Sequence, residues 1–407
     1  MTACDPQGKI IAVRKQDAGF RGCDIIFVSL ENWDEVWRRN QFICASLAGR
    51  FPESKILFVG PPRDVSNSVR RGRLSHLATA GTWTTAEHPN ITVTRPLKWL
   101  PNSIALGRRL NESLALRRTK RVARQLGMDK PLLWLNPHFA VSMAGRLNES
   151  AIIYDITDDW TELDVSGAEA QLIASQDADL CRLADAVIVC SERLHEKKRS
   201  LAKQLHLIPN GVHAVHYESV LDRGRALPAE AARWKRPVLG YTGTVHSSRV
   251  DVGLIEALAR SCSHGSVVLI GPDFLSPADA ARLDNVGNVH RLPPVPYSRI
   301  PDYMRAFDVC IVPHRMTAFT ESLNPIKLWE YLAAGKPIVS TAVPGFRDYP
   351  ELVHVAQNAG DFIARIDAAL REGRDKVEAR QREARRHSWD SRVDDVVRVI
   401  ESCVSKT

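Results

Sequence analysis

Short apolar runs alternate along the chain with segments long enough to form helices. The runs are rich in Val, Ile and Leu and lack strict apolar–polar alternation, which is typical of strands buried on both faces of a parallel sheet. Alternation of such strands with helices predicts βαβ units in doubly wound sheets. The expected strands lie within residues 24–29, 55–60, 91–96, 131–136, 151–155, 185–190 and 206–210, then 237–243, 266–271, 289–294, 308–313, 336–341 and 352–356.

A polar, charged stretch at 218–236 separates the two series of runs and is interpreted as a linker. We therefore expect an α/β chain with two Rossmann-like, doubly wound domains facing a cleft. In such sheets, ligands bind beyond the carboxyl ends of the strands. The expected division is a disordered lead at 1–21, a first domain at 22–217, the linker, a second domain at 237–386 and a helix at 387–407 that crosses back to the first domain.

Composition places the chain among globular proteins of a reducing compartment. Hydrophobic content is 44% and charged content 25%, as in globular proteins. The length of 407 residues is enough for two domains. No run approaches the roughly 20 apolar residues of a membrane-spanning helix, and the first twenty residues lack the apolar region of a signal peptide. The eight cysteines are irregularly spaced. We therefore expect a cytoplasmic protein with neither a disulfide framework nor a zinc site.

The formal net charge of +8 gathers partly on a predicted helix over residues 108–124. Leu106, Leu110 and Leu114 recur there at every fourth position, so part of this helix is amphipathic. One interpretation is a solvated helix face. The other is peripheral contact with an anionic membrane, at the inner face of the plasma membrane, where each cation contributes about 1 kcal/mol. Nucleic acid is not an expected partner, because no basic motif interleaved with aromatic residues is present.

The strongest chemical signal is the segment 321–341. Asn324 and Pro325 open a predicted helix that begins with Ile326 and holds Lys327 and Glu330 on one face. A helix N-terminus attracts phosphate through its free N–H groups and its dipole, and a lysine there adds a point charge. A carboxylate nearby can accept hydrogen bonds from ribose hydroxyls. Taken alone, the lysine and glutamate could also form an ordinary surface ion pair.

A second signal is the turn in GYTGTVHSSRV, residues 240–250. Gly243 allows the backbone to approach a phosphate closely, with Thr244 beside it and Arg249 just before a helix expected at about Val250. The alternative is a plain strand–turn–helix connection.

Three acids, Asp155, Asp158 and Asp159, follow a predicted buried strand. Clustered carboxylates raise one another's pKa, so Asp158 or Asp159 could act as general base on an acceptor hydroxyl. Capping of the next helix is the alternative for either residue. His138 also follows a strand, although a lone histidine is usually structural.

The segment after the first strand, 29–42, carries Glu31, Trp33, Asp34 and Arg38, together with Trp37. Exposed aromatic rings stack on sugar faces, so this segment is the expected acceptor site. Trp37 lies at helical spacing and could equally belong to the core.

These segments together resemble GT-B glycosyltransferases, especially family 4 and its teichuronic-acid-type relatives. The resemblance covers most of the chain and is carried by 321–341, YDITDDW (154–160), ADAVIVCSERL (184–194), LIPNGV (207–212), GYTGTV (240–245) and SWDSR (388–392). It implies that the first domain binds the acceptor and the second the nucleotide. It also implies that Glu330 binds the donor ribose, that Lys327 and the start of its helix meet the diphosphate, and that His138 lies near the donor sugar.

One position departs from the family pattern. Relatives usually carry a glutamate eight residues before the second glutamate, where it faces the transferred sugar; that position is Ser322 here, and Glu321 lies one residue early. The expected donor-binding residues are Gly243, Thr244, Arg249, Asn324, Pro325, Ile326, Lys327 and Glu330. The expected catalytic residues are Asp158, Asp159 and His138, and the expected acceptor-binding residues are Glu31, Trp33, Asp34 and Arg38.

The function that follows is transfer of a sugar from a nucleoside-diphosphate sugar to a saccharide or lipid-linked acceptor in cell-surface polysaccharide synthesis. A UDP-sugar is favoured over a GDP-sugar as substrate, and neither a metal ion nor another cofactor is expected. Two alternatives remain open: a nucleotide-sugar epimerase of the same fold, and a non-catalytic nucleotide-sugar-binding subunit of a polysaccharide assembly complex.

Overall fold

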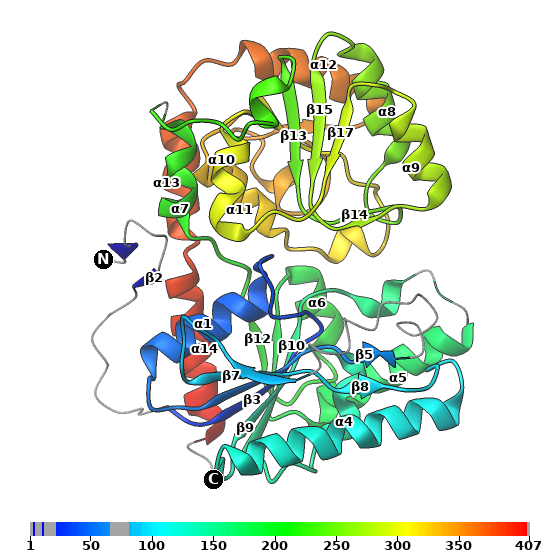
Figure 1. Ribbon diagram of the computed structural model, residues 1–407, viewed down its shortest axis with the longest axis vertical. Coiled ribbons are helices and arrows are strands. Elements are labelled where there is room, and N and C mark those ends of the chain that lie inside the picture. Colours follow the sequence, from blue (N-terminus) through cyan, green and yellow to red (C-terminus); the bar gives the residue numbers. More distant parts are fainter. Residues whose placement is uncertain are drawn as a thin grey trace. The chain divides into compact units, whose positions relative to one another are not determined.

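The computed structural model describes residues 22–65, 81–163, 165, 167–222 and 224–404, together with the backbone of β1 (Ala3–Cys4) and β2 (Ile10–Ile11). β1 and β2 pair antiparallel; the rest of the expected lead lies outside the described residues. The chain divides into two compact units (Figure 1). Unit 1 comprises the chain up to Pro209 and the segment from Arg392, and unit 2 runs from Asn210 to Ser391.

Unit 1 is built on an eight-stranded sheet of order β12-β11-β10-β9-β3-β4-β7-β6. All neighbours run parallel except β6, which pairs antiparallel with β7. The chain winds outward in one direction from β3 to β7 and in the other from β9 to β12, so the switch point lies between β3 and β9. The strands are β3 (Ile25–Val28), β4 (Ile56–Val59), β6 (Thr82–Thr84), β7 (Ile91–Thr94), β9 (Leu132–Leu135), β10 (Ala151–Ile156), β11 (Ala186–Val189) and β12 (Leu205–Leu207), with a small parallel pair β5 (Arg63–Asp64) and β8 (Leu97–Lys98).

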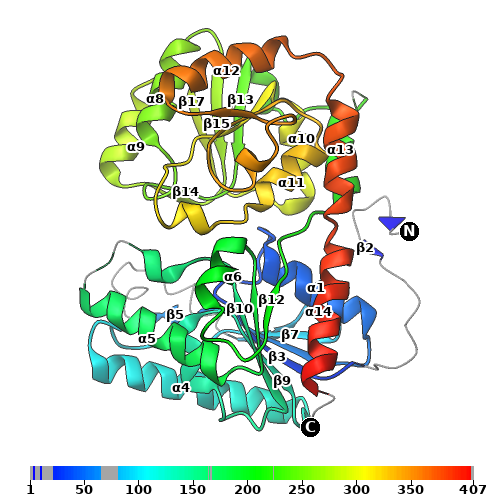
Figure 2. The same cartoon turned by 180° about the vertical axis from the view of Figure 1, so that it is seen from behind.

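Side chains alternate between the two faces of this sheet along each strand. Both faces are buried because other parts of unit 1 pack against them. Ile26 and Leu57 pack with Leu116 and Leu180 from helices on one face. Phe27, on the other face, stacks between Phe58 and Trp134 at centroid distances of 5.8 and 5.2 Å. Figures 1 and 2 show which helices cover each face. The helices are α1 (Arg39–Arg50), α4 (Ala105–Gln125), α5 (Gly167–Leu183), α6 (Glu192–Lys198) and α14 (Trp389–Val404), with short η1 (His138–Met143) and η2 (Trp160–Glu162).

Unit 2 repeats the same logic with a six-stranded, all-parallel sheet of order β17-β15-β13-β18-β19-β20. Its switch point lies between β13 and β18. The strands are β13 (Val238–Thr242), β15 (Ser266–Ile270), β17 (Val289–Leu292), β18 (Val309–Val312), β19 (Ile338–Thr341) and β20 (His354–Ala356), with a small pair β14 (Val245–His246) and β16 (Asp273–Phe274).

Helices cover both faces of the second sheet. Residues of α7, α10, α11 and α13 share one core cluster with Val268 and Cys310, and residues of α8, α9 and α12 share the other with Val267 and Ile311. The helices are α7 (Ala214–Glu218), α8 (Val252–Ser261), α9 (Pro277–Asp284), α10 (Ile300–Met304), α11 (Ile326–Ala333), α12 (Ala359–Arg371) and α13 (Val377–Arg386), with short η3 (Ser219–Leu221), η4 (Ala231–Arg233), η5 (Tyr297–Arg299), η6 (Thr320–Ser322) and η7 (Phe346–Asp348).

Each apolar run expected to be a strand overlaps one, and the predicted pair of Rossmann-like, doubly wound α/β domains is confirmed. The boundaries differ. The structure places the described part of 218–236 inside unit 2 rather than between the units, because Val220, Ala231 and Trp234 are buried in its core. Charged residues at the surface concealed these anchors. At the other end, α14 lies beside α1 in Figure 2. Its Asp394 forms an ion pair with Arg50 of α1 within unit 1.

Candidate functional site

Two sequence signals 84 residues apart meet at the carboxyl end of β13 in unit 2 (327 − 243 = 84). Gly243 leaves the strand with φ of 134°, a conformation that L side chains rarely adopt. A Cβ built on this glycine would overlap Cε and Nζ of Lys327, so the lysine side chain lies directly against the turn. The Lys327 ammonium also sits 5.3 Å from the centroid of the Tyr241 ring. The turn and the helix start thus form one cationic corner.

The backbone of this turn is held by the neighbouring strand. The Gly243 amide donates to the Ile270 carbonyl at 2.7 Å, so this N–H is used within the fold. The next amide, that of Thr244, has no hydrogen-bond partner in the described part of the chain. Its carbonyl accepts from the Tyr241 hydroxyl at 3.0 Å. An anion at this turn would therefore meet the Thr244 amide, not the Gly243 amide.

Gly271, which was not among the predicted site residues, allows the Gly243 turn to pack closely against the end of β15. It follows β15 with φ of 146°, and a Cβ here would overlap the Gly243 carbonyl. The only signal in the sequence was a glycine closing the neighbouring apolar run.

The helix α11 begins as expected. Pro325 is its N-cap, Ile326 is its first residue, and Gly335 ends it with φ of 67°. Glu330 lies one turn after Lys327 and accepts a hydrogen bond from the Tyr217 hydroxyl through Oε1 at 2.7 Å. Its Oε2 has no hydrogen-bond partner among the described residues. Burial raises the pKa of Glu330, while Tyr217 and Lys327 act to lower it. A carboxylate with one open oxygen suits a ribose hydroxyl donor.

His314 completes the corner from the end of β18, across the switch point. Its Nε2 lies 3.2 Å from the Tyr241 hydroxyl, and its buried Nδ1 has no hydrogen-bond partner among the described residues. Burial lowers its pKa, and the positive charges of Lys327 and Arg249 lower it further. The Arg249 guanidinium lies 5.5 Å from the centroid of the Phe319 ring. Two predicted donor-binding cations therefore lower the pKa of one histidine. Its buried Nδ1 is available to a water molecule or a ligand.

Asn324 and Ser322 have structural contacts. Asn324 Oδ1 accepts from the Asn210 amide at 2.9 Å and thereby holds the turn at Asn210. Ser322 is fully buried and donates to the Phe319 carbonyl at 2.7 Å. Glu321 pairs with Arg347 at 3.0 Å. The donor-binding role of Asn324 stays a prediction.

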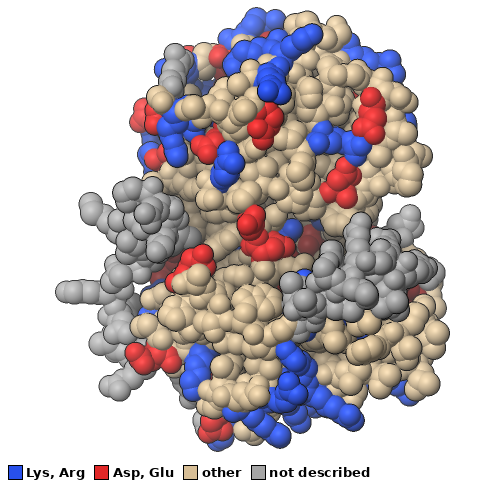
Figure 3. All heavy atoms as spheres, viewed as in Figure 1, with Lys and Arg blue, Asp and Glu red and all other residues tan. Residues whose placement is uncertain are grey.

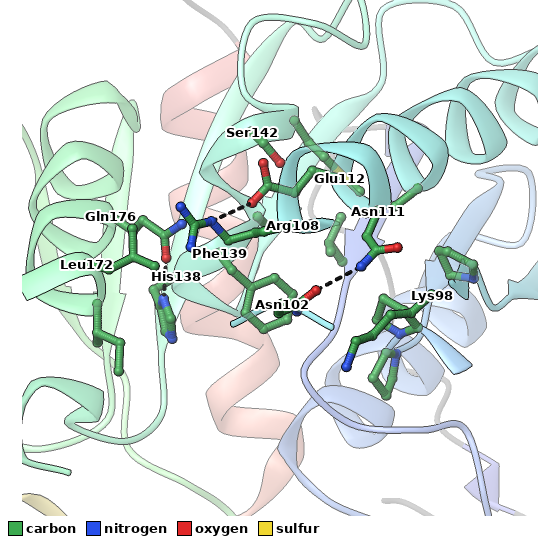
Figure 4. A pocket seen from close by; sticks show the side chains of 18 of the residues that line it. Lys98, Asn102, Arg108, Asn111, Glu112, His138, Phe139, Ser142, Leu172 and Gln176 are labelled. Atoms are coloured by element: carbon green, nitrogen blue, oxygen red, sulfur yellow. Dashed lines mark hydrogen bonds and ion pairs between the residues drawn. The ribbon is translucent and has the colours of Figure 1, made fainter. Parts of the chain in front are cut away.

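Unit 1 holds a cavity of about 730 Å³ at the carboxyl ends of its central strands (Figure 4). Ser29 follows β3, Gly60 follows β4 and His138 follows β9, so the cavity spans the switch point. Helices α4 and α5 supply much of the wall, including Arg108, Glu112 and Gln176. Figure 4 shows His138 beside Gln176, with the ring of Phe139 close by.

His138, a predicted catalytic residue, lines this cavity and pairs through Nδ1 with Gln176 Oε1 at 2.9 Å. Burial lowers its pKa, against the effects of Gln176 and Asp177. The imidazole is therefore neutral at neutral pH. The mixture of amide, guanidinium, carboxylate and aromatic groups around it suits a polyhydroxylated ligand.

The predicted acceptor residues form one folded loop after β3. Arg38 lies 3.7 Å from both Glu31 and Asp34. Trp33 packs edge-on against Phe58 at 5.1 Å and lies 6.2 Å from Trp37. The loop thus brings together Glu31, Trp33, Asp34 and Arg38.

Glu31 carries the most unusual charge in this loop. Its Oε2 is buried and has no hydrogen-bond partner among the described residues. Burial raises its pKa to about 7; Asp158, Asp34 and Asp155 add to the shift, and Arg38 opposes it. The sequence predicts a raised pKa within the aspartate cluster, whereas in the structure the raised pKa belongs to Glu31.

We expect Glu31→Gln to be more stable than the wild type above pH 7. The folded-state pKa of about 7 exceeds the ordinary 4.5. The stability that protonated Glu31 contributes is therefore fully present below pH 4.5 and is lost as the pH rises through 7. The side chain is 27% exposed, and we expect a difference of about 1–3 kcal/mol in the free energy of unfolding. Urea unfolding from about pH 5 to about pH 8 measures it. Glu35→Gln, on the same loop, is the control. If the free energy of unfolding changed equally with pH in wild type and Glu31→Gln, the prediction would be contradicted.

The acids after β10 are mostly paired. Asp159 is buried, caps η2 through the Thr161 amide and pairs with Lys197 at 2.9 Å. Burial acts to raise its pKa, but the hydrogen bonds from Lys197 and Thr161 prevail and lower it. Asp155 is held by the Arg39 guanidinium at 3.1 Å. The expectation that clustering raises the pKa was therefore wrong for Asp159, and capping, the alternative, is observed. Asp158 is half-buried, and its catalytic role stays a prediction.

Sequence reasoning missed Tyr217, Tyr241 and Gly271. Tyr241 lies in β13 at the switch point, and Gly271 follows the neighbouring strand β15; only the strand order shows this. Tyr217 contacts Glu330 across 113 residues and had no local signal. Within the described residues, no group of three or more His, Cys, Asp or Glu side chains is arranged to hold a metal ion, and no helix is long and apolar enough to cross a membrane.

Comparisons with known proteins agree with this arrangement. Residues 236–372 match the family model "Glycosyl transferases group 1". Over 259 residues the chain is 27% identical to the "Putative teichuronic acid biosynthesis glycosyltransferase TuaH" of Bacillus subtilis (strain 168), covering 59% of this chain and 64% of that relative. The chain thus spans less than two thirds of the relative's length.

Solved structures show the same fold. The sucrose-phosphate synthase from Thermosynechococcus elongatus superposes with a TM-score of 0.69 at 16% identity, over 95% of this chain and 100% of that one. Anabaena HepE in complex with UDP and glucose gives a TM-score of 0.65 at 16% identity, over 94% and 100%. The resemblance to GT-B glycosyltransferases is confirmed. The chain has the GT-B fold, and its residues 236–372 are similar to the glycosyl transferases group 1 family.

Proposed function

We propose that this chain is a glycosyltransferase that moves a sugar from a nucleoside-diphosphate sugar, with UDP favoured as the nucleotide, to an acceptor used in cell-surface polysaccharide synthesis. The observation that carries the proposal is the contact between Lys327 and the Gly243 turn. It places a cation, a helix start and a glycine turn at the switch point of a doubly wound sheet, where such sheets bind nucleotides. The UDP bound by Anabaena HepE supports the choice of base.

In this proposal the diphosphate is the leaving group and gains negative charge as the sugar departs. Lys327, Arg249 and the Thr244 amide stabilise that charge, and preorganised donors of this kind make the largest contribution in many enzymes. Glu330 accepts from the ribose. These roles need neither a metal ion nor another cofactor. The roles themselves, and the absence of a cofactor, are part of the proposal.

The acceptor site is proposed in unit 1, in the cavity that His138 and Arg108 line. Its position at the switch point of the sheet supports this assignment. Glu31, Trp33, Asp34 and Arg38 form the neighbouring loop after β3 and would contact the acceptor there. We place the protein on the cytoplasmic side of the membrane, where nucleotide sugars are substrates and the exposed cations of α4 meet anionic lipid.

A non-catalytic nucleotide-sugar-binding subunit is the second candidate, and Ser322 favours it. Relatives place a glutamate at this position to face the transferred sugar, whereas Ser322 is buried and bonded to Phe319. Glu321 does not replace it, because its carboxylate pairs with Arg347. Slow hydrolysis of a bound UDP-sugar by the purified protein distinguishes an enzyme from such a subunit.

Calorimetric titration with UDP tests the nucleotide site. We expect wild type to bind UDP and Glu330→Ala to bind it about tenfold or more weakly, because a carboxylate that accepts from ribose contributes about 1.5–3 kcal/mol. Glu378→Ala, on the exposed face of α13, is the matched control and should bind as wild type does.

Mass-spectrometric screening of nucleotide sugars then identifies the donor. Equal UDP affinity in wild type and Glu330→Ala would remove the role assigned to Glu330. No affinity for UDP or GDP in the wild type would overturn the proposed function.

A further inference from the structure

The outer surface of unit 1 carries a dense group of exposed apolar side chains. In the part of the chain that the structure describes, eleven large apolar side chains are exposed, and five of them lie between residues 99 and 110. Scattered single residues of this kind are ordinary, but exposed apolar side chains concentrated in one turn and the start of the following helix indicate a contact surface. We call this group the ledge: Trp99, Leu100, Ile104, Leu106 and Leu110.

Hydrogen bonds from a buried asparagine fix the turn that carries the ledge. Asn111, a buried residue of α4, accepts from the Trp99 amide at 3.0 Å and donates to the Leu100 carbonyl at 2.7 Å and to Asn102 Oδ1 at 2.9 Å. Gly107 allows this turn to pack on the helix, because a Cβ there would lie 2.6 Å from the Pro101 carbonyl. These contacts fix the turn while Ile104 and Leu106 remain 58% and 75% exposed.

The leucine stripe expected from the sequence therefore faces outward at its first two positions. The buried face of α4 is formed instead by other residues: Gly107, Asn111, Ala115, Leu116, Thr119, Val122 and Ala123. A helix that buries one face in the core of its domain normally exposes a polar opposite face. In α4 the first turns of the exposed face instead carry the apolar residues Leu106 and Leu110.

Positive charge continues the same outer face. Arg109, Arg117, Arg121 and Arg124 are exposed, and none forms an ion pair with a described acidic residue. Figure 3 shows Lys and Arg side chains gathered over α4 at the lower edge of the view. Apolar side chains at one end and unpaired arginines along one face match the composition of helices that lie in the interface of an anionic membrane.

The side chains on the inner side of the same segment line the cavity of unit 1. Lys98, Asn102, Ser103 and Arg108 belong to its wall, and Figure 4 shows Asn102 and Arg108 there. The segment that carries the ledge therefore also supplies part of the cavity wall.

We propose that the ledge and the arginine face of α4 dock on an anionic phospholipid membrane, so that the unit 1 cavity receives an acceptor anchored in that membrane. This rests on the proposed function for the cavity, while the docking stands on the surface itself. A second copy of the chain is disfavoured as occupant, because a two-fold contact through α4 would bring its arginines together. Trp99 suits the membrane interface, where tryptophan is enriched.

Flotation of the full-length protein with vesicles tests the docking. We expect wild type to float with vesicles of phosphatidylcholine and phosphatidylglycerol, and not with phosphatidylcholine alone. The triple variant Ile104→Ser, Leu106→Ser and Leu110→Ser should float about tenfold less, since each buried apolar side chain and each cation adds to interfacial binding. Leu183→Ser, an exposed leucine at the end of α5, is the matched control and should float as wild type does.

A second readout locates the contact. Brominated phospholipid should quench part of the tryptophan fluorescence of wild type, and Trp99→Phe should lose that quenched part. Wild type that stays in solution, a triple variant that floats as well as wild type, or quenching unchanged in Trp99→Phe would each overturn the docking.

UDP titration of the same samples keeps the two proposals apart. The triple variant should bind UDP as wild type does, which also shows that it is folded. A wild type that floats but binds no nucleotide would overturn the proposed function and leave the docking intact; binding to DNA that is unchanged in the triple variant, without flotation, would replace the membrane by nucleic acid.

Discussion

Replacing Lys327 with alanine is expected to weaken UDP binding about 10- to 100-fold. Its ammonium lies against the Gly243 turn and near the Tyr241 ring. A charge-assisted hydrogen bond to a phosphate contributes about 1.5–3 kcal/mol, and every 1.4 kcal/mol is about tenfold in affinity. Calorimetric titration of UDP into both proteins measures the effect.

Lys327→Met separates the charge from the packing of the aliphatic stem. It keeps a side chain of similar length against Gly243 and removes the ammonium, so its loss of UDP affinity should match that of Lys327→Ala. Lys235→Ala, an exposed lysine elsewhere in unit 2, should bind UDP as wild type does. If Lys327→Met kept wild-type affinity, the lysine would serve as packing and the phosphate site would have to lie elsewhere.

Gly271→Ala is expected to destabilise unit 2 by about 2–4 kcal/mol and to weaken UDP binding as well. Its φ of 146° is unfavourable for alanine, and the new Cβ would overlap the Gly243 carbonyl. The overlapped atom is backbone and cannot rotate away, so the Gly243 turn must shift. Urea unfolding and UDP titration of one preparation measure both effects.

Gly253→Ala provides the control for this glycine. It lies in the first turn of α8, where a Cβ would lie 3.3 Å from Asp251 Oδ1 and 3.8 Å from Arg282 Nη2, both side-chain atoms. Alanine is the better helix former by up to about 1 kcal/mol, so this variant should be as stable as wild type or more stable. A Gly271→Ala protein with wild-type stability and UDP affinity would show that the turn is not held where the structure places it.

Local pattern predicted the architecture well because the strands are buried on both faces. Continuous Val, Ile and Leu runs such as 308–313 can be recognised without knowing their partners, and each overlaps a strand. The helix at 326–333 with its glycine end was equally legible, since capping depends on neighbours in sequence. The same reasoning failed at 218–236, where a few buried side chains such as Trp234 outweigh a charged composition.

The chemistry of individual side chains was less accessible. The aspartates after β10 are a cluster in sequence, yet Asp159 is neutralised by Lys197 from α6 and Asp155 by Arg39 from α1. The raised pKa expected there belongs to Glu31, which burial and surrounding acids disfavour as an anion. Likewise, the leucines at 106 and 110 showed an amphipathic helix, but only packing decides which face turns outward.

The order of apolar runs, turns and caps along the chain thus specified two doubly wound sheets and the start of helix α11, where we propose that phosphate binds, because these depend on periodicity and on residues a few positions apart. Folding decided which distant groups meet: Lys327 with Gly243, Glu330 with Tyr217, and Asp159 with Lys197. Their pKa values and open hydrogen-bonding atoms depend on burial and on charges brought close by the sheet order, and neither is encoded in any short stretch of sequence.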